Sequence, residues 1–257
     1  MIKYLDFVLP EPDRHGADKP GYKTDLTWET LQKFRNEVRI SKKFNNYLKD
    51  KSVIVVGPSP YLKGKGKGEF IDSHDIVIRM NKGWKPNPEL HKDYGSRTDI
   101  RWHCMMEHMN NGGPFDINGM VDYGVKWLAS PFPRNLDYFH NDNIKFEAQN
   151  YEEKINFYCF SDLIYYINVM MALETRPNVG TVIFADLMNY DIKNIHLCGI
   201  TFLLDGYLSE YGRNPDFKKL TIGHATEPQV HLAKLFLENE PEKFSMDQEI
   251  IDLIYQI

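Results

Sequence analysis

The feature that most constrains the fold is a run of four apolar β-forming residues, at positions 53–56, that leads directly into Gly57. The run does not alternate with polar residues, so both faces of the strand are expected to be buried, as in a parallel sheet. Similar stretches occur at residues 76–78, 125–129 and 195–198. Apolar residues at helical spacing occur at residues 161–174, 181–190 and 228–238. Strands that alternate with helices predict an α/β fold with a mostly parallel central sheet flanked by helices.

The chain shows neither an internal repeat nor a linker, and this pattern predicts one main domain. Residues 1–23 are rich in proline, glycine and charge, which is typical of an irregular arm. We expect residues 1–49 to form this arm and a helix packed on the domain. Residues 50–257 are expected to form the domain itself.

Capping residues mark the predicted boundaries of two helices. Either Asp25 or Thr27 can cap a first helix, which is predicted to end near Asp50. Ser245 and Gln248 have the spacing of a capping box, so they predict the start of the last helix.

The composition excludes several classes of protein. Of the 257 residues, 42% are hydrophobic and 26% are charged, as in ordinary globular proteins. The net charge of −5 argues against a nucleic-acid groove, which would need an excess of basic residues. The sequence contains neither an apolar run of the ~20 residues that span a bilayer nor the core of a signal peptide. We therefore expect a soluble, cytoplasmic protein that binds no nucleic acid.

The cysteines and histidines predict no metal cofactor. Cys104, Cys159 and Cys198 are an odd number at wide spacing, which fits neither a disulfide framework nor a zinc motif. Residues 103–108 hold two histidines and a glutamate without an accepted ligand spacing, and the chain has no Asp-x-Asp motif. These observations favour free thiols and chemistry that needs no metal.

Polar residues follow the first two predicted strands. Residues 55–60 read Val-Val-Gly-Pro-Ser-Pro, which matches neither the dinucleotide fingerprint nor a P-loop. Gly57 can let backbone approach a ligand and Ser59 adds a hydroxyl, although a plain strand-to-loop turn explains both equally well. Arg79 and Asn81 end the next strand at the edge where ligands bind in such sheets. Asn81 can donate and accept, which suits a base or a ribose.

Further candidates lie in the C-terminal half. Gly180 stands just ahead of a predicted helix, whose first N–H groups attract phosphate, and Asn178 can cap that helix or contact a ligand. Tyr207 and Tyr211 offer neutral hydroxyl donors, or are plain surface residues on a loop.

A histidine with a second possible role stands before the predicted helix at 228–238. His224 follows Gly223, and its imidazole, with an unperturbed pKa of ~6.5, suits proton transfer near neutrality. The alternative is a loop histidine without a chemical role, since the chain has nine histidines.

The order of these motifs resembles that in the sialyltransferases of glycosyltransferase family twenty-nine. The stretches "VVGPS", "LKGKGKG", "IDSHD" and "RMN" stand in the order of the family's large sialylmotif, and "YGSRTDI" resembles the stretch that follows it. Residues 176–200 look like the small sialylmotif, and "IGHATE" looks like the last motif. The segment that starts at "GHATE" is also similar to bacterial family forty-two sialyltransferases. The resemblance covers roughly residues 50–240.

The resemblance implies a fold, a reaction and a set of site residues. It implies a single Rossmann-like domain of GT-A type, a CMP-sialic acid donor, a glycan acceptor, and inverting transfer without a metal. His224 would be the general base. The donor would be bound by Gly57, Pro58, Ser59, Asn81, Asn178, Gly180, Tyr207, Tyr211 and Gly223.

The sequence also departs from the family pattern. Pro58 stands where the family has asparagine, and Val179 stands where a hydroxyl residue is usual. Val53 and Ile192 occupy the approximate places of the cysteines that join the two motifs in animal members. Three alternatives therefore stay open: transfer of Kdo from its CMP donor, a nucleotide-binding pyrophosphokinase, and a sugar-nucleotide binding protein without turnover.

Overall fold

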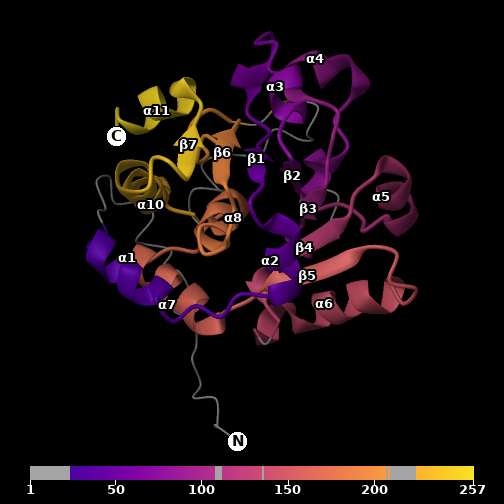
Figure 1. Ribbon diagram of the computed structural model, residues 1–257, viewed down its shortest axis with the longest axis horizontal. Coiled ribbons are helices and arrows are strands. Elements are labelled where there is room, and N and C mark those ends of the chain that lie inside the picture. Colours follow the sequence, from indigo (N-terminus) through magenta and orange to yellow (C-terminus); the bar gives the residue numbers. More distant parts are fainter. Residues whose placement is uncertain (1–23, 108–111, 135, 207, 209–223) are drawn as a thin grey trace, which may run out of the picture.

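A seven-stranded parallel sheet forms the centre of the molecule (Figure 1). The computed structural model describes residues 24–107, 112–134, 136–206, 208 and 224–257. Within them the strands are β1 (Ser52–Val56), β2 (Ile76–Met80), β3 (Ile100–Trp102), β4 (Trp127–Pro133), β5 (Asn156–Phe160), β6 (Asn194–Cys198) and β7 (Phe244–Met246). Their order is β5-β4-β3-β2-β1-β6-β7, and each neighbouring pair runs parallel. The predicted α/β fold with a mostly parallel sheet is confirmed.

Helices cover both faces of this sheet. They are α1 (Trp28–Arg35), α2 (Lys42–Leu48), α3 (Gly68–Asp72), α4 (His91–Tyr94), α5 (Ile117–Tyr123), α6 (Asp137–Gln149), α7 (Leu163–Leu173), α8 (Val179–Leu187), α10 (Thr226–Asn239) and α11 (Gln248–Ile254). Val53 and Val55 of β1 belong to a large core cluster shared with α1, α2, α7, α8 and α10. Ile54 and Val56 face the opposite layer, which contains α3 and α4. Helices cover both faces of the sheet, so the side chains of residues 53–56 are apolar on either face, as the uninterrupted run predicted.

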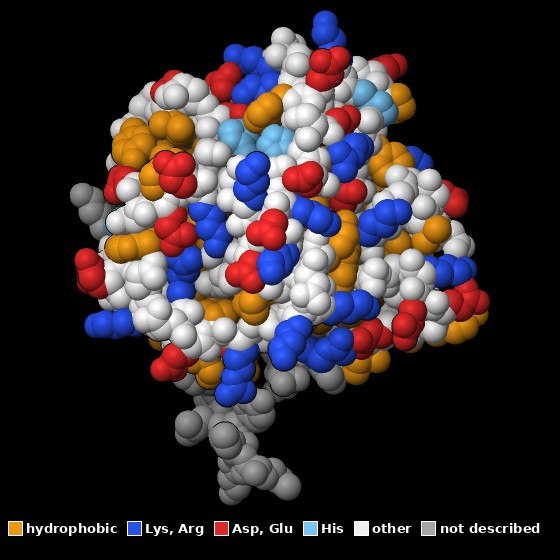
Figure 2. Space-filling view, in the orientation of Figure 1, with side chains coloured by type: hydrophobic (Ala, Val, Ile, Leu, Met, Phe, Trp, Pro, Cys, Tyr) orange, Lys and Arg blue, Asp and Glu red, His pale blue; other side chains and the backbone are white. Residues whose placement is uncertain are grey.

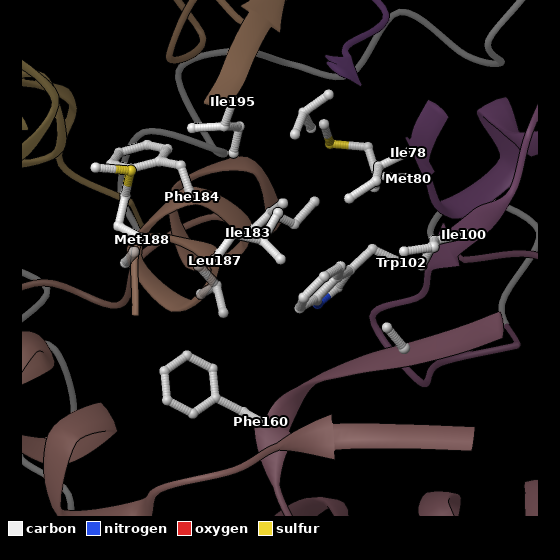
Figure 3. Close-up of a cluster of buried hydrophobic side chains, with 14 of the residues drawn as sticks. Ile78, Met80, Ile100, Trp102, Phe160, Ile183, Phe184, Leu187, Met188 and Ile195 are labelled. Atoms are coloured by element: carbon white, nitrogen blue, oxygen red, sulfur yellow. The ribbon is translucent and has the colours of Figure 1, made fainter. Parts of the chain in front are cut away.

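The larger layer is organised around α8. Figure 3 shows Ile183 and Leu187 of α8 pointing toward Trp102 of β3, with Met80 and Ile195 beside them. All five side chains are buried. Full burial of such side chains stabilises the fold by roughly 1.5–3 kcal/mol each, so these contacts hold α8 firmly against the sheet.

The N-terminal helical region differs from its prediction. The single helix expected to end near Asp50 is two helices, α1 and α2, separated at residues 36–41. Thr27 caps the first, and the hydroxyl of Ser41 accepts a hydrogen bond from the N–H of Phe44 and starts the second. The apolar stripe continues across the break because Leu31 and Phe44 both reach the core, so periodicity alone could not show it.

The C-terminal prediction needs a similar correction. Ser245 lies in β7, where its hydroxyl bonds the imidazole of His196, and Asp247 is the residue that precedes α11. The strands β3, β5 and β7 were absent from the prediction. β3 and β7 span only three residues each, and Arg101 interrupts the apolar pattern of β3. Three-residue strands of this kind leave no continuous apolar run in the sequence, whereas β5 does contain one, at residues 157–160.

The surface carries charges of both signs. Figure 2 shows acidic and basic side chains interspersed over the face that it displays. Ion pairs near the surface include Lys65 with Glu249 and Lys154 with Glu152. Among the described helices, none has the length and apolar character required to cross a membrane.

The strand order defines where the site lies. The chain proceeds outward from β1 through β2, β3 and β4 to β5, and then returns to place β6 on the other side of β1. Ligands of open parallel sheets bind beyond the carboxyl ends of the strands at such a reversal. Here the two strand ends are followed by Gly57 and Gly199.

This arrangement yields a stability prediction for Gly57. A Cβ atom at Gly57 would lie 2.1 Å from the carbonyl oxygen of Gly199, a backbone atom fixed by β6. We expect Gly57→Ala to lower the free energy of unfolding by about 3 kcal/mol or more, at the upper end of overpacking costs. Urea denaturation of the ligand-free protein measures it.

Gly64→Ala is the matched control. Gly64 has a φ of +81° and nothing near its missing Cβ, so alanine there should cost only the left-handed backbone penalty of about 1–2 kcal/mol. Equal losses for the two variants would contradict the close approach of the strand ends.

Candidate functional site

The floor of the site is the contact between the ends of β1 and β6. The N–H of Gly57 donates to the carbonyl of Cys198 at 2.7 Å, and the N–H of Ser59 donates to that of Gly199 at 3.2 Å. Gly199 has a φ of +71°, and a Cβ there would meet the carbonyl of Gly57 at 2.7 Å. The glycine at 57 therefore makes room for the neighbouring backbone; the sequence left the approach of a ligand and a plain strand-to-loop turn equally open.

The residues after β6 connect this floor to two helix starts. Ile200 lies against both predicted glycines, since a Cβ at Gly57 or at Gly180 would fall 2.8 Å or 3.2 Å from its side chain. The carbonyl of Phe202 accepts a 3.0 Å hydrogen bond from the hydroxyl of Thr226, the first residue of α10. The loop after β1, the loop after β6 and the starts of α8 and α10 thus converge.

The start of α8 holds two predicted donor-binding residues. The side-chain oxygen of Asn178 accepts a 2.9 Å hydrogen bond from the N–H of Thr181, so Asn178 is the cap of α8. α8 begins at Val179, and Gly180 lies inside its first turn, not ahead of it. The first N–H groups of a helix lack partners within the helix and favour anions.

His224 lies two residues before the start of α10, and one of its ring nitrogens is hydrogen-bonded. Nδ1 lies 2.6 Å from the carbonyl oxygen of Arg176. A carbonyl can only accept, so Nδ1 carries the proton and Nε2 keeps a lone pair. Burial lowers the pKa of His224 to about 4, and the positive charge of Arg176 acts in the same direction. The imidazole is therefore neutral, with Nε2 as its acceptor, at every pH well above that value.

The loop after β1 already has partners in this structure. Ser59 is buried, and its hydroxyl donates to the carboxylate of Asp205 at 2.9 Å. The carbonyl of Pro58 accepts a 2.7 Å hydrogen bond from the N–H of Leu208. Asp205 and Leu208, which follow the β6 loop, therefore lie against the predicted donor-binding residues Pro58 and Ser59. An anionic ligand at Ser59 would have to compete with the carboxylate of Asp205.

Asn81 and Arg79 differ in their surroundings. Asn81 follows β2, and its side-chain oxygen accepts a 2.8 Å hydrogen bond from the N–H of Cys104, which leaves the amide NH₂ as its donor. Arg79 was expected to face the ligand crevice, and this is wrong. Its guanidinium is buried and donates to the carbonyls of Arg97 and Tyr94, so it supports the loop beside β2.

Backbone strain gathers at the same edge of the sheet. Four residues other than glycine adopt a left-handed conformation after strands β2, β3 and β6: Asn81 (φ 53°), Met105 (φ 62°), Phe202 (φ 52°) and Leu203 (φ 71°). Such conformations cost about 1–3 kcal/mol each and tend to cluster at functional sites. Only Asn81 was selected from the sequence, because nothing in the residue type of the other three signals this conformation.

The remaining predicted residues divide into two groups. Tyr207, Tyr211 and Gly223 lie outside the described residues. His103 is buried with both ring nitrogens bonded, to the carbonyl of Gly113 and the N–H of Met105. Burial lowers its pKa to about 3.

Within the described part of the chain, histidine, cysteine and acidic residues form no group of three or more that could hold a metal ion.

Comparison with known proteins adds a family to this geometry. The family described as "Glycosyltransferase family 29 (sialyltransferase)" matches residues 11–155. Two similar proteins, from mouse and rat, are both CMP-N-acetylneuraminate-beta-galactosamide-alpha-2,3-sialyltransferase 2, with 27% identity over 146 residues. That alignment covers 54% of this chain and 41% of each relative, so the chain spans about two fifths of their length.

Solved structures with a similar fold include mammalian and bacterial sialyltransferases. A mammalian sialyltransferase in complex with Gal-beta-1-3GalNAc-ortho-nitrophenol has a TM-score of 0.53 and 16% identity, over 87% of this chain and 80% of that one. CstII from Campylobacter jejuni, in complex with CMP-3FNeuAc, gives 0.51 and 15%, over 79% and 83%. Cst-I from the same organism gives 0.53 and 15%, over 83% and 80%. The fold is shared, although the sequences have diverged widely.

The protonation of His224 can be measured directly. In a ¹⁵N-histidine NMR titration, we expect the His224 ring to carry its proton on Nδ1 and to titrate at about pH 4. Arg176→Gln should raise this pKa, because it removes a positive charge that disfavours the imidazolium.

Lys193→Gln is the control for this titration. Lys193 is exposed and precedes β6 at the opposite edge of the sheet, so removal of its charge should leave the His224 titration in place. A His224 pKa near the ordinary ~6.5 of histidine, or Nε2 as the protonated nitrogen, would show that the described environment is incorrect.

Proposed function

The chain belongs to glycosyltransferase family 29, the sialyltransferases, and we propose that it transfers sialic acid from CMP-sialic acid to a hydroxyl group of a glycan. One observation carries this proposal: His224, with Nδ1 bonded to the carbonyl of Arg176 and a lone pair on Nε2, stands between the segments that lead into α8 and α10, beside the loop after β6. The family match covers residues 11–155, so His224 and the starts of α8 and α10 lie beyond the matched segment.

The proposed step is a single displacement at the anomeric carbon. Nε2 of His224 accepts the proton of the acceptor hydroxyl while its oxygen attacks the anomeric carbon from the face opposite CMP. The new carbon–oxygen bond forms as the bond to the CMP phosphate oxygen breaks, so the configuration inverts. CMP leaves with the electron pair of that bond, and His224 holds the proton.

The phosphate of the donor would lie between the first turn of α8 and the loop after β1. Backbone N–H groups at a helix start stabilise the negative charge that grows on the leaving phosphate. The hydroxyl of Ser59 would add a donor after it exchanges Asp205 for the phosphate. Two negative groups cannot share this hydroxyl without repulsion, so donor binding would displace Asp205.

The same residues could serve a related donor. Val179, at the first position of α8, is half-buried and replaces the hydroxyl residue usual in the family. The loss of this hydroxyl near the donor keeps transfer of Kdo, another acid sugar carried by CMP, as a second candidate. The absence of an Asp-x-Asp motif from the sequence supports transfer without a metal for either donor.

A ligand panel tests the choice of nucleotide and donor. Thermal unfolding is measured with CMP, CMP-sialic acid, CMP-Kdo, UDP and ATP with magnesium. A ligand that binds only the folded state raises the unfolding temperature, so we expect increases with CMP and CMP-sialic acid and little change with UDP or ATP. Transfer from CMP-sialic acid should continue in excess EDTA. Stabilisation by ATP with magnesium alone, or a larger response to CMP-Kdo with transfer of Kdo only, would overturn the proposal.

His224→Ala tests the general base. Turnover per folded, CMP-binding molecule should fall by about 10²–10⁴-fold, the usual contribution of a general base, while CMP affinity changes little. In the parent enzyme, kcat/KM should decline only below about pH 4, where the imidazole becomes protonated and cannot accept a proton.

His231→Ala is the matched control for this variant. His231 lies in α10, the helix that follows His224, and its ring is likewise bonded to a backbone carbonyl: its Nε2 lies 2.7 Å from the carbonyl oxygen of Leu26, on the side of the N-terminal segment. This variant should turn over as the parent does. Normal turnover by His224→Ala, or an equal loss in both variants, would place the base elsewhere.

A further inference from the structure

Two segments far apart in the sequence lie side by side at His224. Residues 175–178 lead into α8, and residues 224–225 lead into α10. The N–H of Ala225 donates to the hydroxyl of Thr175 at 2.9 Å, and Nδ1 of His224 donates to the carbonyl of Arg176 at 2.6 Å. The tautomer of His224 therefore depends on the relative position of these two segments.

The side chain of Gln229 spans both segments. It is fully buried, and its oxygen accepts from the N–H of Asn178 and from the hydroxyl of Thr181, each at 2.8 Å. Its NH₂ group donates to the carbonyl of Ala225 at 2.7 Å. A carboxamide is the side-chain group that can accept at one end and donate at the other without charge.

These contacts of Gln229 lie on both sides of the hydrogen bond between His224 and the carbonyl of Arg176, which sets the tautomer. Ala225 directly follows His224, and Asn178 lies two residues after Arg176. Each partner in the Nδ1–carbonyl bond is therefore within two residues of a backbone group held by Gln229. If this bridge is lost, the carbonyl of Arg176 can move away from Nδ1.

We propose that Gln229 is a positioning residue, which holds His224 as the Nδ1–H tautomer with Nε2 directed to the acceptor. This rests on the proposed function, in which Nε2 accepts the proton. In the other tautomer Nε2 carries a proton and cannot act as a base. Displacement of a catalytic group by about 1 Å can lower a rate by roughly 10²-fold, so a bridge of this kind has a measurable effect.

Gln229→Met removes the bridge while it keeps the volume. This variant, the variant Gln229→Glu and the parent are compared by kcat per folded molecule, donor KM and the ¹⁵N-histidine spectrum. The signals of His224 are identified as those that are missing from the spectrum of His224→Gln. We expect kcat to fall roughly 10- to 100-fold, with a smaller change in donor KM, since Asn178 still caps α8 through its own side chain. The His224 signals should shift toward the Nε2–H tautomer.

Gln229→Glu supplies a rescue that a purely structural role would not give. Ionised glutamate can accept from Asn178 and Thr181 but repels the carbonyl of Ala225, whereas protonated glutamate can donate to it. Burial raises a carboxyl pKa, so this variant should recover kcat relative to the parent as the pH falls from about 8 to about 5.5. The Nδ1–H tautomer of His224 should return over the same range.

Tyr165→Phe is the matched control. It removes one buried hydrogen bond, of 3.0 Å, between α7 and the carbonyl of Ala185 in α8, and it leaves the bridge intact. This variant should lose stability but keep the parent kcat and the His224 tautomer.

The outcomes separate the two proposals. Parent-like kcat and an unchanged His224 tautomer in both Gln229 variants would overturn the positioning role. If the parent transfers no sugar from any CMP donor, the proposed function fails, whereas the NMR signals still report whether Gln229 sets the tautomer. If Gln229→Met does not fold, the pH dependence of Gln229→Glu decides, and a constant tautomer from about pH 8 to 5.5 would overturn the positioning role.

Discussion

The close approach of two backbones, at Gly57 and Gly199, is the constraint on which the site depends. The missing side chain at 57 lets the end of β1 bond the end of β6, with 2.7 Å between the N–H of Gly57 and the carbonyl of Cys198. Ile200 then lies against Gly57 and Gly180, so the position of the sheet edge also fixes the start of α8. A larger residue at 57 would displace several loops together.

The chemistry of the site follows from how its polar groups are already paired. The carbonyl of Arg176 accepts a hydrogen bond from the protonated Nδ1 of His224, and burial keeps the pKa of the imidazole low. The hydroxyl of Ser59 is bonded to Asp205, a partner that an anionic donor would replace. In the proposed cycle, the base is fixed before substrate arrives, whereas the phosphate contacts form only when the donor binds.

Sequence patterns predicted the parallel sheet and the helix at Pro228, because long apolar runs and helical spacing can be recognised in the sequence without knowledge of the tertiary contacts. They singled out Gly57 and Gly180, which both pack against Ile200, but they placed Gly180 ahead of a helix whose first turn contains it. Arg79 was misjudged because burial of a guanidinium against carbonyls leaves no trace in the sequence. Gln229 was missed because its hydrogen-bond partners Asn178 and Thr181 lie about 50 residues away in the sequence.

The central claim is that a cytidine nucleotide lies at the reversal between β1 and β6. The most direct measurement is the change in backbone amide NMR signals of the full chain during titration with CMP, and with UMP for comparison. We expect saturable shifts at Gly57, Ser59 and Gly180 with CMP and much smaller shifts with UMP, while Gly124, far from this edge, stays constant. Saturable binding of CMP that leaves these three signals in place would contradict the account.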